Sequence, residues 1–420
     1  MKIAAVIAEY NPFHNGHLYQ LKEIRRRTDA DLIVVMMSGD FVQRGGPACM
    51  DKYIRCRMAL SAGADIVFEL PVYGAMGSAE IFASSAVSLL NHLGCIDYLC
   101  FGAETDRPGY LEQIAHILAD EPQLYRDALK KALQEGMNFP TARSIALSFC
   151  LQDNDLKTIL NQPNNILAIE YMKALYRTDS SICPVLIRRT GAGYHSTDIS
   201  GPFSSATAIR SRLEKLPIRQ NPLEEDILPE DLAIPDQTYF LIKDYIAAKG
   251  ILTRNDFSQM LAFRLLEPNL DLMRFADITE DIANRIDSCR HQFQTTDQFI
   301  ELLTTRNFTA SRISRCLFHI LLGHEKNLLE EWKKNNYGGS LRVLGFRISA
   351  GDFWKEIPGS FRKQLVMRTA KDARQLTGSG PAIFQADLYA SRLYRQTLRC
   401  KYQISLPAIE SEPVIIFGRN

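Results

Sequence analysis

Short, continuous apolar runs alternate with helical patterns in the first half of the chain. The runs cover residues 3–8, 32–37, 66–70, 98–101 and 185–187, and most are rich in Val, Ile or Leu. Strands that are apolar on both faces are typical of a sheet that is covered on both sides. Helical periodicity fills residues 17–28, 51–62 and 78–93 between the runs. This repetition predicts an α/β fold with a parallel sheet and right-handed crossovers.

The later segments predict helices and a connection between domains. Residues 110–177 have helical periodicity, with helices expected at 111–119, 122–134 and 165–176. We interpret this segment as an insertion before the last strand of the sheet. After residues 204–213, four prolines at positions 217, 222, 229 and 235 indicate an interdomain connection.

The second half, from about residue 237, is mostly helical by its period. Apolar side chains recur at i, i+3, i+4, i+7 and i+8 from Ile313, which predicts an amphipathic helix over residues 310–322. Residues 341–346 and 412–417 are expected to add strands. The predicted division is one domain over residues 1–215, with a helical insertion at about 110–180, and a mostly helical domain over 216–420.

Charge and cysteine content narrow the class of protein. The formal net charge is +1, so a nucleic-acid site would need local clusters of Lys and Arg. The nine cysteines include no C-x-x-C pair, which predicts buried thiols in a reducing compartment and no zinc site. We find no signal peptide and no apolar stretch of membrane-spanning length, so a cytoplasmic location is expected.

The strongest local signal is the segment from Tyr10 to His17, which follows the first strand and opens the first helix. Ligands of open α/β sheets lie at the carboxyl ends of strands, and a helix N-terminus there attracts phosphate. Gly16 lets the backbone approach a phosphate oxygen, and both His14 and His17 can donate hydrogen bonds to it. The alternative is that both are surface histidines in a polar loop.

Two signatures resemble those of a known superfamily. The segment His14-Asn15-Gly16-His17 is similar to the H-x-G-H motif of nucleotidyltransferases, which include class I aminoacyl-tRNA synthetases and small adenylyltransferases. The segment from Ser205 to Arg210 resembles their S-S/T-T-x-I-R signature, except that Ala206 replaces the second hydroxyl residue. The likeness implies ATP binding, reaction at the α-phosphate and stabilisation of the pyrophosphate leaving group.

Several longer strings narrow the resemblance. The chain contains AEYNPFHNGHLYQL, MSGDFVQRGGPA, DIVFELPV, FGAE, QPNNILAIEY and RRTGAGYH. Together they are similar to the bacterial tRNA(Met) cytidine acetate ligase family. The resemblance implies a Rossmann-like nucleotidyltransferase domain, ATP with Mg²⁺, and acetate as substrate. It also implies acetylation of N4 of the wobble cytidine of elongator tRNA(Met).

The resemblance also implies which residues bind ATP. They are the segment of Ile7, Ala8, Glu9, Tyr10, Asn11, Pro12, Phe13, His14, Asn15, Gly16, His17, Leu18, Tyr19 and Gln20, together with Gly102, Asn165, Arg188 or Arg189, Ser205 and Thr207. His14 and His17 are expected to stabilise charge on the leaving pyrophosphate, together with the helix N-terminus and Mg²⁺.

The residues themselves leave alternatives at three of these places. Gly102 ends a strand and could face a nucleotide or could be a turn glycine. Asn165, near a helix start, could contact the nucleotide or cap the helix. Arg188 and Arg189 point to opposite faces of a strand, so we expect only one to reach the phosphates.

The loop at residues 38–46 follows the second strand and supplies two further candidate catalytic residues. Arg44 could hold a carboxylate substrate or a tRNA phosphate, and Asp40 could orient an amine or a metal-bound water. The alternative is a polar loop with a local Asp–Arg pair. Lys52 and Arg55, in the next helix, could contact phosphate or lie on a solvated face.

Basic clusters are the candidates for RNA binding. They are Arg25–Arg27, Lys52 with Arg55 and Arg57, and Arg306 with Arg312 and Arg315. Phe308 lies among the last group and could stack on an unpaired base. Taken singly, such a cluster is more often a solvated face than an RNA contact.

Two rival functions remain at this stage. A small-molecule adenylyltransferase would share both signatures, although such enzymes often have one domain. A catalytically silent RNA-binding protein could keep the fold, although the intact His14, Gly16, His17 and Arg210 argue against it.

Overall fold

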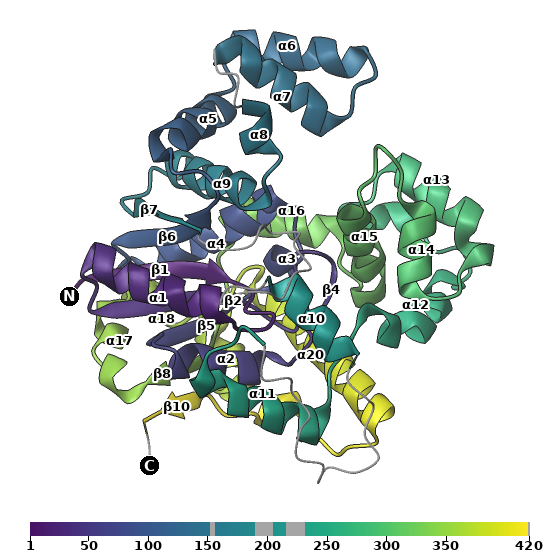
Figure 1. Cartoon of the computed structure of the whole chain (residues 1–420). Coiled ribbons are helices and arrows are strands. Elements are labelled where there is room, and N and C mark those ends of the chain that lie inside the picture. The colour runs from purple at the N-terminus through teal and green to yellow at the C-terminus, as the bar shows by residue number, and fades with distance from the viewer. Residues whose placement is uncertain (152–155, 190–204, 216–231, 419–420) are drawn as a thin grey trace.

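A mostly parallel sheet forms the centre of the molecule (Figure 1). The computed structural model describes residues 1–151, 156–189, 205–215 and 232–418. The strand order is β10-β8-β5-β2-β1-β6-β7, with β9 beside β8. The strands are β1 (Ile3–Ala8), β2 (Leu32–Ser38), β5 (Ile66–Leu70), β6 (Tyr98–Ala103), β7 (Cys183–Arg188), β8 (Leu341–Arg347), β9 (Leu365–Val366) and β10 (Ile415–Phe417). The predicted strands of the first half are confirmed, and they pair in parallel as predicted.

Alternate residues of the central strands enter two different cores. Val34 and Met36 of β2 belong to the core on one face, whereas Val35 and Met37 belong to the core on the other. Every residue of β2 is buried. A continuous apolar run is therefore what this strand requires, because neither of its faces reaches water.

Helices cover both faces of the sheet. On one face lie α1 (Asn15–Thr28), α2 (Lys52–Ser61) and α11 (Asp236–Lys249), whose Leu21, Met58 and Ile242 share a core. The other face is covered by α4 (Ala79–Leu93) and α9 (Pro163–Arg177). The last turn of α1 carries the basic run 25–27, which suits the negative end of the helix dipole.

The predicted helical insertion lies above the edge of the sheet formed by β6 and β7 (Figure 1). It comprises α5 (Pro108–Asp120), α6 (Gln123–Gln134), α7 (Phe139–Cys150), α8 (Leu156–Leu160) and α9. The sequence patterns predicted α5, α6 and α9 but not α7 or α8. α7 is as long as α6, and α8 has only five residues, too few for a periodic pattern.

The second half is helical but also extends the sheet. β8 pairs antiparallel to β5, and β9 and β10 each run parallel to β8. The expected strands near 341–346 and 412–417 are thus confirmed, and they join the sheet of the first half. The division at residues 215 and 216 remains a prediction. Prolines 217, 222 and 229 lie outside the described residues.

The remaining elements surround this frame. They are β3 (Phe41–Val42), β4 (Gly46–Pro47), α3 (Val72–Ala75), α10 (Ala206–Glu214), η1 (Arg254–Phe257), α12 (Ser258–Leu265), η2 (Leu272–Arg274), α13 (Glu280–Cys289), η3 (Arg290–Gln292), α14 (Thr296–Leu303), α15 (Ala310–Leu322), α16 (Lys326–Lys334), η4 (Ile348–Ala350), α17 (Phe353–Glu356), α18 (Gly359–Arg362), α19 (Thr369–Asp372), η5 (Ala373–Gln375), α20 (Gly380–Tyr402) and η6 (Ile409–Ser411). All nine cysteines are free thiols. The expectation of buried thiols is correct for Cys49, Cys56, Cys100 and Cys316 and wrong for the other five, of which Cys183 and Cys400 are exposed. In the part of the chain that the structure describes, no helix is both long and apolar enough to cross a membrane.

Candidate active site

A cavity opens at the carboxyl ends of β1, β6 and β7, where the N-termini of α1 and α10 also meet. The positive ends of two helix dipoles make this edge of the sheet suitable for phosphate. The described residues that line it are Ile7, Ala8, Glu9, Tyr10, Asn11, His14, His17, Gln20, Gln43, Arg44, Phe82, Phe101, Gly102, Asn164, Leu167, Tyr171, Arg189, Ser205, Ala206, Thr207 and Arg210.

His14 and His17 form a reciprocal cap at the start of α1. The backbone N–H of Gly16 donates to Nδ1 of His14 over 3.1 Å, and the N–H of His14 donates to Nδ1 of His17 over 3.2 Å. The two rings stack with their centroids 3.7 Å apart. Because Nδ1 of each neutral ring is an acceptor, the proton must lie on Nε2. Each ring therefore has an Nε2–H to donate to a ligand of the cavity.

Burial keeps both rings neutral. It lowers the pKa of His14 to about 3, with further lowering by Arg189 and Arg210. Burial also lowers the pKa of His17 well below its usual value, helped by His14 and Arg189. His14 is buried and His17 half-buried, so the alternative of two surface histidines is wrong. Neutral imidazoles donate hydrogen bonds without the cost of a buried charge.

The two sequence signatures meet through Arg210. Its Nη1 donates to the carbonyl oxygen of Asn11 over 2.6 Å, and its Nη2 donates to Oγ1 of Thr207 over 3.1 Å. Ser205 caps α10 by accepting a hydrogen bond from the N–H of Ala208 over 3.1 Å. Segments almost two hundred residues apart in the chain are thereby held at one cavity. Ser204 and Gly191 lie outside the described residues.

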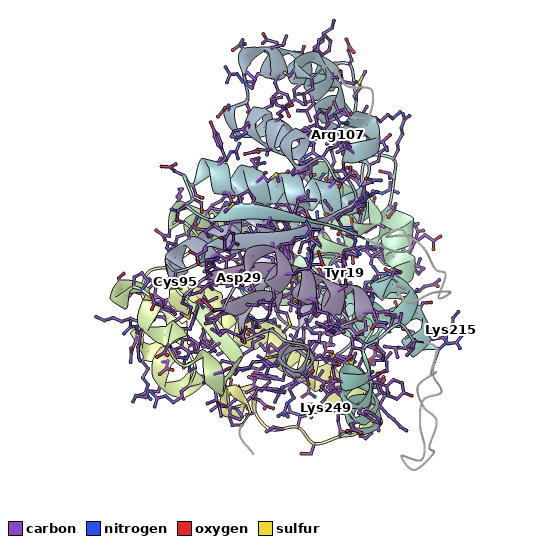
Figure 2. The ribbon with its side chains drawn as sticks, turned by 60° about the vertical axis from the view of Figure 1, so that its left-hand side comes forward. Tyr19, Asp29, Cys95, Arg107, Lys215 and Lys249 are labelled. Atoms are coloured by element: carbon purple, nitrogen blue, oxygen red, sulfur yellow. The ribbon has the colours of Figure 1, made fainter. Side chains whose placement is uncertain are left out.

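Only part of the segment from Ile7 to Gln20 lines the cavity. Pro12, Phe13, Asn15, Gly16, Leu18 and Tyr19 are absent from the lining residues. Tyr10 and Phe13 have fully buried rings 4.8 Å apart, which hold the turn before α1. Tyr19 lies on α1 (Figure 2). A Cβ on Gly16 would approach Cε1 of His14 to 2.9 Å, so glycine keeps the ring of His14 in place.

Arg188 and Arg189 point to different surroundings, as strand alternation requires. Arg189 lines the cavity, whereas Arg188 makes an exposed ion pair with Asp106 over 3.1 Å. Gly102 also lines the cavity, and a Cβ there would lie 3.2 Å from Cγ of Arg189. The glycine leaves room for the stem of that arginine.

Asn165 is fully buried and lies outside the lining residues, although its neighbour Asn164 is one of them. Oδ1 of Asn165 accepts from the N–H groups of Glu104 and Thr105 over 2.9 and 3.2 Å. The expected N-cap role is wrong, because Gln162 occupies that position. The side chain of Asn165 shapes the loop after β6 instead, and Oε1 of Glu104 accepts from Nδ2 of Asn164.

Asp40 is buried away from the cavity. Its carboxylate accepts from the N–H of Lys52 over 2.9 Å and from the hydroxyl of Ser391 over 2.7 Å. Burial alone would raise its pKa, but Lys52, Ser391 and Arg55 outweigh this effect and keep the pKa below its usual value. Among the described residues, Asp40 therefore binds Lys52 and Ser391 and not Arg44. This buried position does not favour a direct role of Asp40 in the chemistry.

Lys52 and Arg55 are also fully buried, so both sequence-based expectations for them are wrong. Nζ of Lys52 donates to Glu69 over 2.6 Å and to Ser391 over 2.7 Å. Arg55 donates to backbone carbonyls, including those of Met50 and Ser38. The sequence could not show this, because their partners come from distant segments.

Arg44 lies at the tip of the hairpin of β3 and β4 and lines the cavity. The hairpin is pinned from two sides. The N–H of Gln43 donates to Oε1 of Glu9 over 2.9 Å, and the carbonyl oxygen of Gly45 accepts from the hydroxyl of Ser314 on α15. The hairpin was not predicted, since two-residue strands leave no periodic signal.

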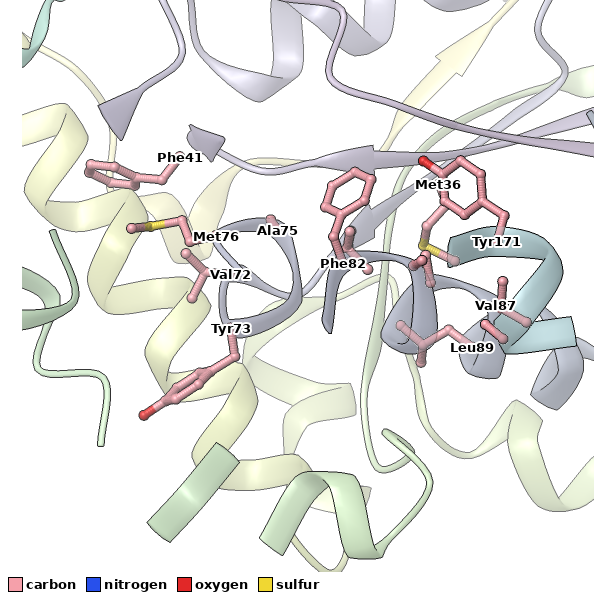
Figure 3. Close-up of a cluster of buried hydrophobic side chains, with 14 of the residues drawn as sticks. Met36, Phe41, Val72, Tyr73, Ala75, Met76, Phe82, Val87, Leu89 and Tyr171 are labelled. Carbon is pink, nitrogen blue, oxygen red and sulfur yellow. The ribbon is translucent and has the colours of Figure 1, made fainter. Parts of the chain in front are cut away.

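The sequence reasoning missed an aromatic wall. Phe82 of α4, Phe101 of β6 and Tyr171 of α9 line the cavity, and the last two rings lie 5.5 Å apart. Phe82, Tyr171 and Met36 belong to one buried hydrophobic cluster (Figure 3). Spacing in the sequence predicts only that these side chains belong to the core. They differ from other core residues because they lie at the end of the cluster that reaches the cavity. Gln43, Asn164, Leu167 and Ala206 were missed as well.

Acidic side chains pair with many arginines of the basic clusters and neutralise much of their positive charge. Arg25 pairs with Asp65 over 2.5 Å, and Arg315 pairs with Asp277 over 2.8 Å. Arg26 and Arg27 both bind Glu23. Arg57 and Arg306 are exposed, and Phe308 lies under the guanidinium of Arg312. An RNA track through these clusters stays a prediction.

Similarity to known sequences agrees with this geometry. Residues 1–406 match the family described as HIGH Nucleotidyl Transferase. The chain is 37% identical over 395 residues to a tRNA(Met) cytidine acetate ligase of Thermoanaerobacter sp. (strain X514), covering 94% of this chain and 95% of that protein. It is 38% identical over 372 residues to one of Acetivibrio thermocellus, covering 88% of each.

Solved structures give the same result. The apo crystal structure of Thermotoga maritima TmcAL matches with a TM-score of 0.90 at 27% identity and covers 99% of both chains. The crystal structure of the same protein bound with alpha-thio ATP matches with a TM-score of 0.85 at 28% identity, again over 99% of both.

Proposed function

Because the chain belongs to the tRNA(Met) cytidine acetate ligase family of HIGH nucleotidyl transferases, we propose that the cavity between α1 and α10 is its active site. There it activates acetate with ATP and passes the acetyl group to N4 of the wobble cytidine of elongator tRNA(Met). The single observation that carries the assignment is the pair of His14 and His17, whose Nδ1 atoms are both occupied by backbone donors.

The described residues that line the cavity suit the binding of a polyphosphate. Two neutral Nε2–H donors, Arg189 and Arg210 line a cavity at which two helices begin. Preorganised donors of this kind stabilise charge that develops on a leaving group without reorganising during the reaction. His14 and His17 therefore act on the pyrophosphate as donors and not as general bases.

The opposite wall suits a nucleoside. Phe101 and Tyr171 present aromatic surface, and Gly102 leaves backbone exposed at the end of β6. An adenine ring packs well against such a surface, and Asn164 supplies a polar group at its edge. The adenosine of ATP would thus lie between β6 and α9, with its phosphates toward α1 and α10.

In the first step a carboxylate oxygen of acetate attacks the α-phosphorus of ATP. The bond from that phosphorus to the bridging oxygen breaks, and pyrophosphate leaves with its electron pair. Arg44 lies on the hairpin at the cavity and can hold the acetate carboxylate by a charge-assisted hydrogen bond. The product is acetyl-adenylate, which is reactive enough to acetylate a weakly nucleophilic amine.

Mg²⁺ would enter with ATP. The described residues contain no group of three or more His, Cys, Asp or Glu side chains that could hold a metal ion. Mg²⁺ commonly keeps several waters and binds mainly through phosphate oxygens, which this donor set accommodates. We also propose a cytoplasmic location, because that is where a tRNA substrate is found.

The test is acetate-dependent exchange of pyrophosphate into ATP, with and without tRNA. We expect exchange that requires acetate, and N4-acetylcytidine in elongator tRNA(Met) when tRNA is added. Turnover on a phosphorylated small molecule without acetate would favour an adenylyltransferase and overturn the proposal. ATP binding without any turnover would show a silent RNA-binding protein.

A further inference from the structure

A second cavity adjoins the first and is larger than acetate requires. It has a volume of about 430 Å³. Five described residues line both cavities, namely Glu9, Asn11, Arg44, Thr207 and Arg210. The two cavities are therefore neighbours across one wall, and that wall contains Arg44, which we place beside acetate, and Arg210, which we place beside the phosphates.

Both halves of the chain build the second cavity. The β3–β4 hairpin and α10 supply one side, with Ser211 on α10. Residues of the helical half, among them Arg254, Asn255 and Asp297, supply the other. Arg254 pairs with Asp297 over 2.7 Å, and the N–H of Asp297 donates to Oδ1 of Asn255 over 2.9 Å. A nucleotidyltransferase domain alone would leave this space open.

The lining suits the edge of a pyrimidine with an exocyclic amine. Carboxylates at Glu9 and Asp297 can accept from an amine such as N4 of cytosine, and Asn255 and Arg254 can donate to ring acceptors such as N3 and O2. Val42, Pro47 and Leu252 provide apolar surface for the face of a base. A base of single-stranded RNA can be splayed out of its stack and inserted in this way.

Glu9 lies where the two cavities meet. It directly follows β1, and its Oε1 is held by the N–H of Gln43. Gln43, which supplies this N–H group, lies on the same hairpin as Arg44. The carboxylate is thus fixed between the phosphate donors on one side and the larger cavity on the other.

We propose that the second cavity receives the cytosine base of the RNA acceptor and that Glu9 accepts the proton that N4 loses. This inference rests on the proposed function, which supplies acetyl-adenylate in the neighbouring cavity. N4 attacks the acetyl carbonyl carbon, the bond from that carbon to the phosphate oxygen breaks, and AMP leaves with the electron pair. The N4 proton moves to the carboxylate of Glu9 and then to solvent.

The first test separates the two half-reactions in Glu9→Gln, which keeps an oxygen for the N–H of Gln43 but removes the base. We expect transfer of acetyl from supplied acetyl-adenylate to tRNA to fall by about 10²–10⁴ more than acetate-dependent exchange falls, which is the usual contribution of a general base. Equal losses in both assays would overturn the role of Glu9. Absence of exchange in the unmodified enzyme would instead refute the proposed function.

The second test fills the cavity. Ser211 lines only the second cavity, so Ser211→Trp is expected to raise KM for tRNA in the transfer assay by about tenfold or more, a loss of about 1.4 kcal/mol. KM for ATP in exchange is expected to change much less. Lys215→Trp is the matched control, because Lys215 is exposed at the end of α10 and outside both cavities (Figure 2). An unchanged KM for tRNA in folded Ser211→Trp, or an equal rise in the control, would overturn the assignment.

Discussion

The two histidines at the start of α1 combine a structural and a chemical task in one side chain. Nδ1 of each ring completes the helix cap, and Nε2 is left with the proton. An N-cap built from Asp or Ser would satisfy the backbone equally well but would place a negative charge or a short hydroxyl at the cavity. Histidine caps the helix and still presents a donor to phosphate.

His17→Asn separates these two tasks. Asparagine can accept from the N–H of His14 in the place of Nδ1 but has no donor where Nε2–H was. We expect acetate-dependent exchange to fall by about 10²–10³ in kcat, the usual loss for one such donor. The melting temperature is expected to stay close to that of the parent. His17→Gln, whose amide reaches the Nε2 position, is expected to keep more activity, and equal losses in both variants would contradict the assignment.

The neighbouring arginines at the end of β7, Arg188 and Arg189, give a second test at the residue scale. Arg189→Ala removes a charged donor from the cavity, and charge-assisted hydrogen bonds contribute about 1.5–3 kcal/mol. We therefore expect KM for ATP in the exchange assay to rise about tenfold or more. Arg188→Ala removes only an exposed ion pair with Asp106 and is the matched control, expected to change KM less than about twofold. Equal effects would show that the cavity does not hold the phosphates.

The low pKa of His14 predicts a dependence of stability on pH. Its folded pKa of about 3 lies below the usual value of 6.5, so the unfolded chain binds the proton more readily. Above about pH 6.5 the contribution of His14 to the free energy of unfolding is fully present. As the pH falls from 6.5 toward 3, this contribution is lost by roughly 1 kcal/mol for each pH unit. Chemical denaturation of the ligand-free protein from pH 7 to 4 measures this slope. The slope is expected to be shallower in His14→Asn, and an unchanged slope would contradict the burial effect.

The β3–β4 hairpin is the element that brings the helical half to the active site. Gly45 at its turn has φ +75°, and a Cβ there would meet the backbone nitrogen of Arg315 at 2.3 Å. Sequence periodicity cannot reveal so short an element, and its two-residue strands are not stable alone. Contact with α15 stabilises it and positions Arg44.

Gly45→Ala tests this contact. The left-handed backbone costs an alanine about 1 kcal/mol, and displacement of the hairpin from α15 adds to this loss. We expect a lower melting temperature and a reduced rate of both half-reactions, measured by thermal unfolding, exchange and transfer. Gly323→Ala is the control, since Gly323 has φ +68° at the end of the same helix but no atom within 4 Å of a new Cβ. A larger effect in the control would show that strain, and not packing, is the cause.

At the scale of the whole molecule, a buried polar network ties the last long helix to the sheet. Lys52 of α2 bonds to Glu69 of β5 and to Ser391 of α20, and Ser391 also bonds to Asp40. The helical half is thus attached through the hydroxyl of Ser391 as well as by strand β8. A buried lysine is tolerated because two carboxylates and a hydroxyl surround it.

The prediction at the scale of the whole molecule concerns Asp387, which lies one turn before Ser391 on α20. Burial and the nearby Glu69 raise its pKa to about 8, while its Oδ1 accepts from the N–H of Val72. The folded state therefore binds a proton that the unfolded chain loses near pH 3.8, and this contribution to stability declines as the pH rises toward 8. Asp387→Asn keeps the acceptor and never ionises. We expect it to raise the melting temperature more at pH 8 than at pH 5, and a uniform change would contradict this.

Local sequence patterns suffice to predict the core of the fold and the first half of the site. Continuous apolar runs identify the strands of a two-sided sheet, because a strand covered on both faces has no polar position to fill. The position of His14, Gly16 and His17 after the first strand places them at the ligand edge of that sheet. These are local signals, readable within a few residues, and the family resemblance adds Ser205 and Thr207.

The tertiary structure alone decided which polar groups meet. Asp40 and Lys52 read as site residues from their place in the sequence, but partners on β5 and α20 bury both. Phe82 and Tyr171 read as core residues, but the cavity reaches them. The physical reason is the same in each case. Periodicity reports whether a side chain faces the interior, whereas its role depends on which distant segment shares that interior.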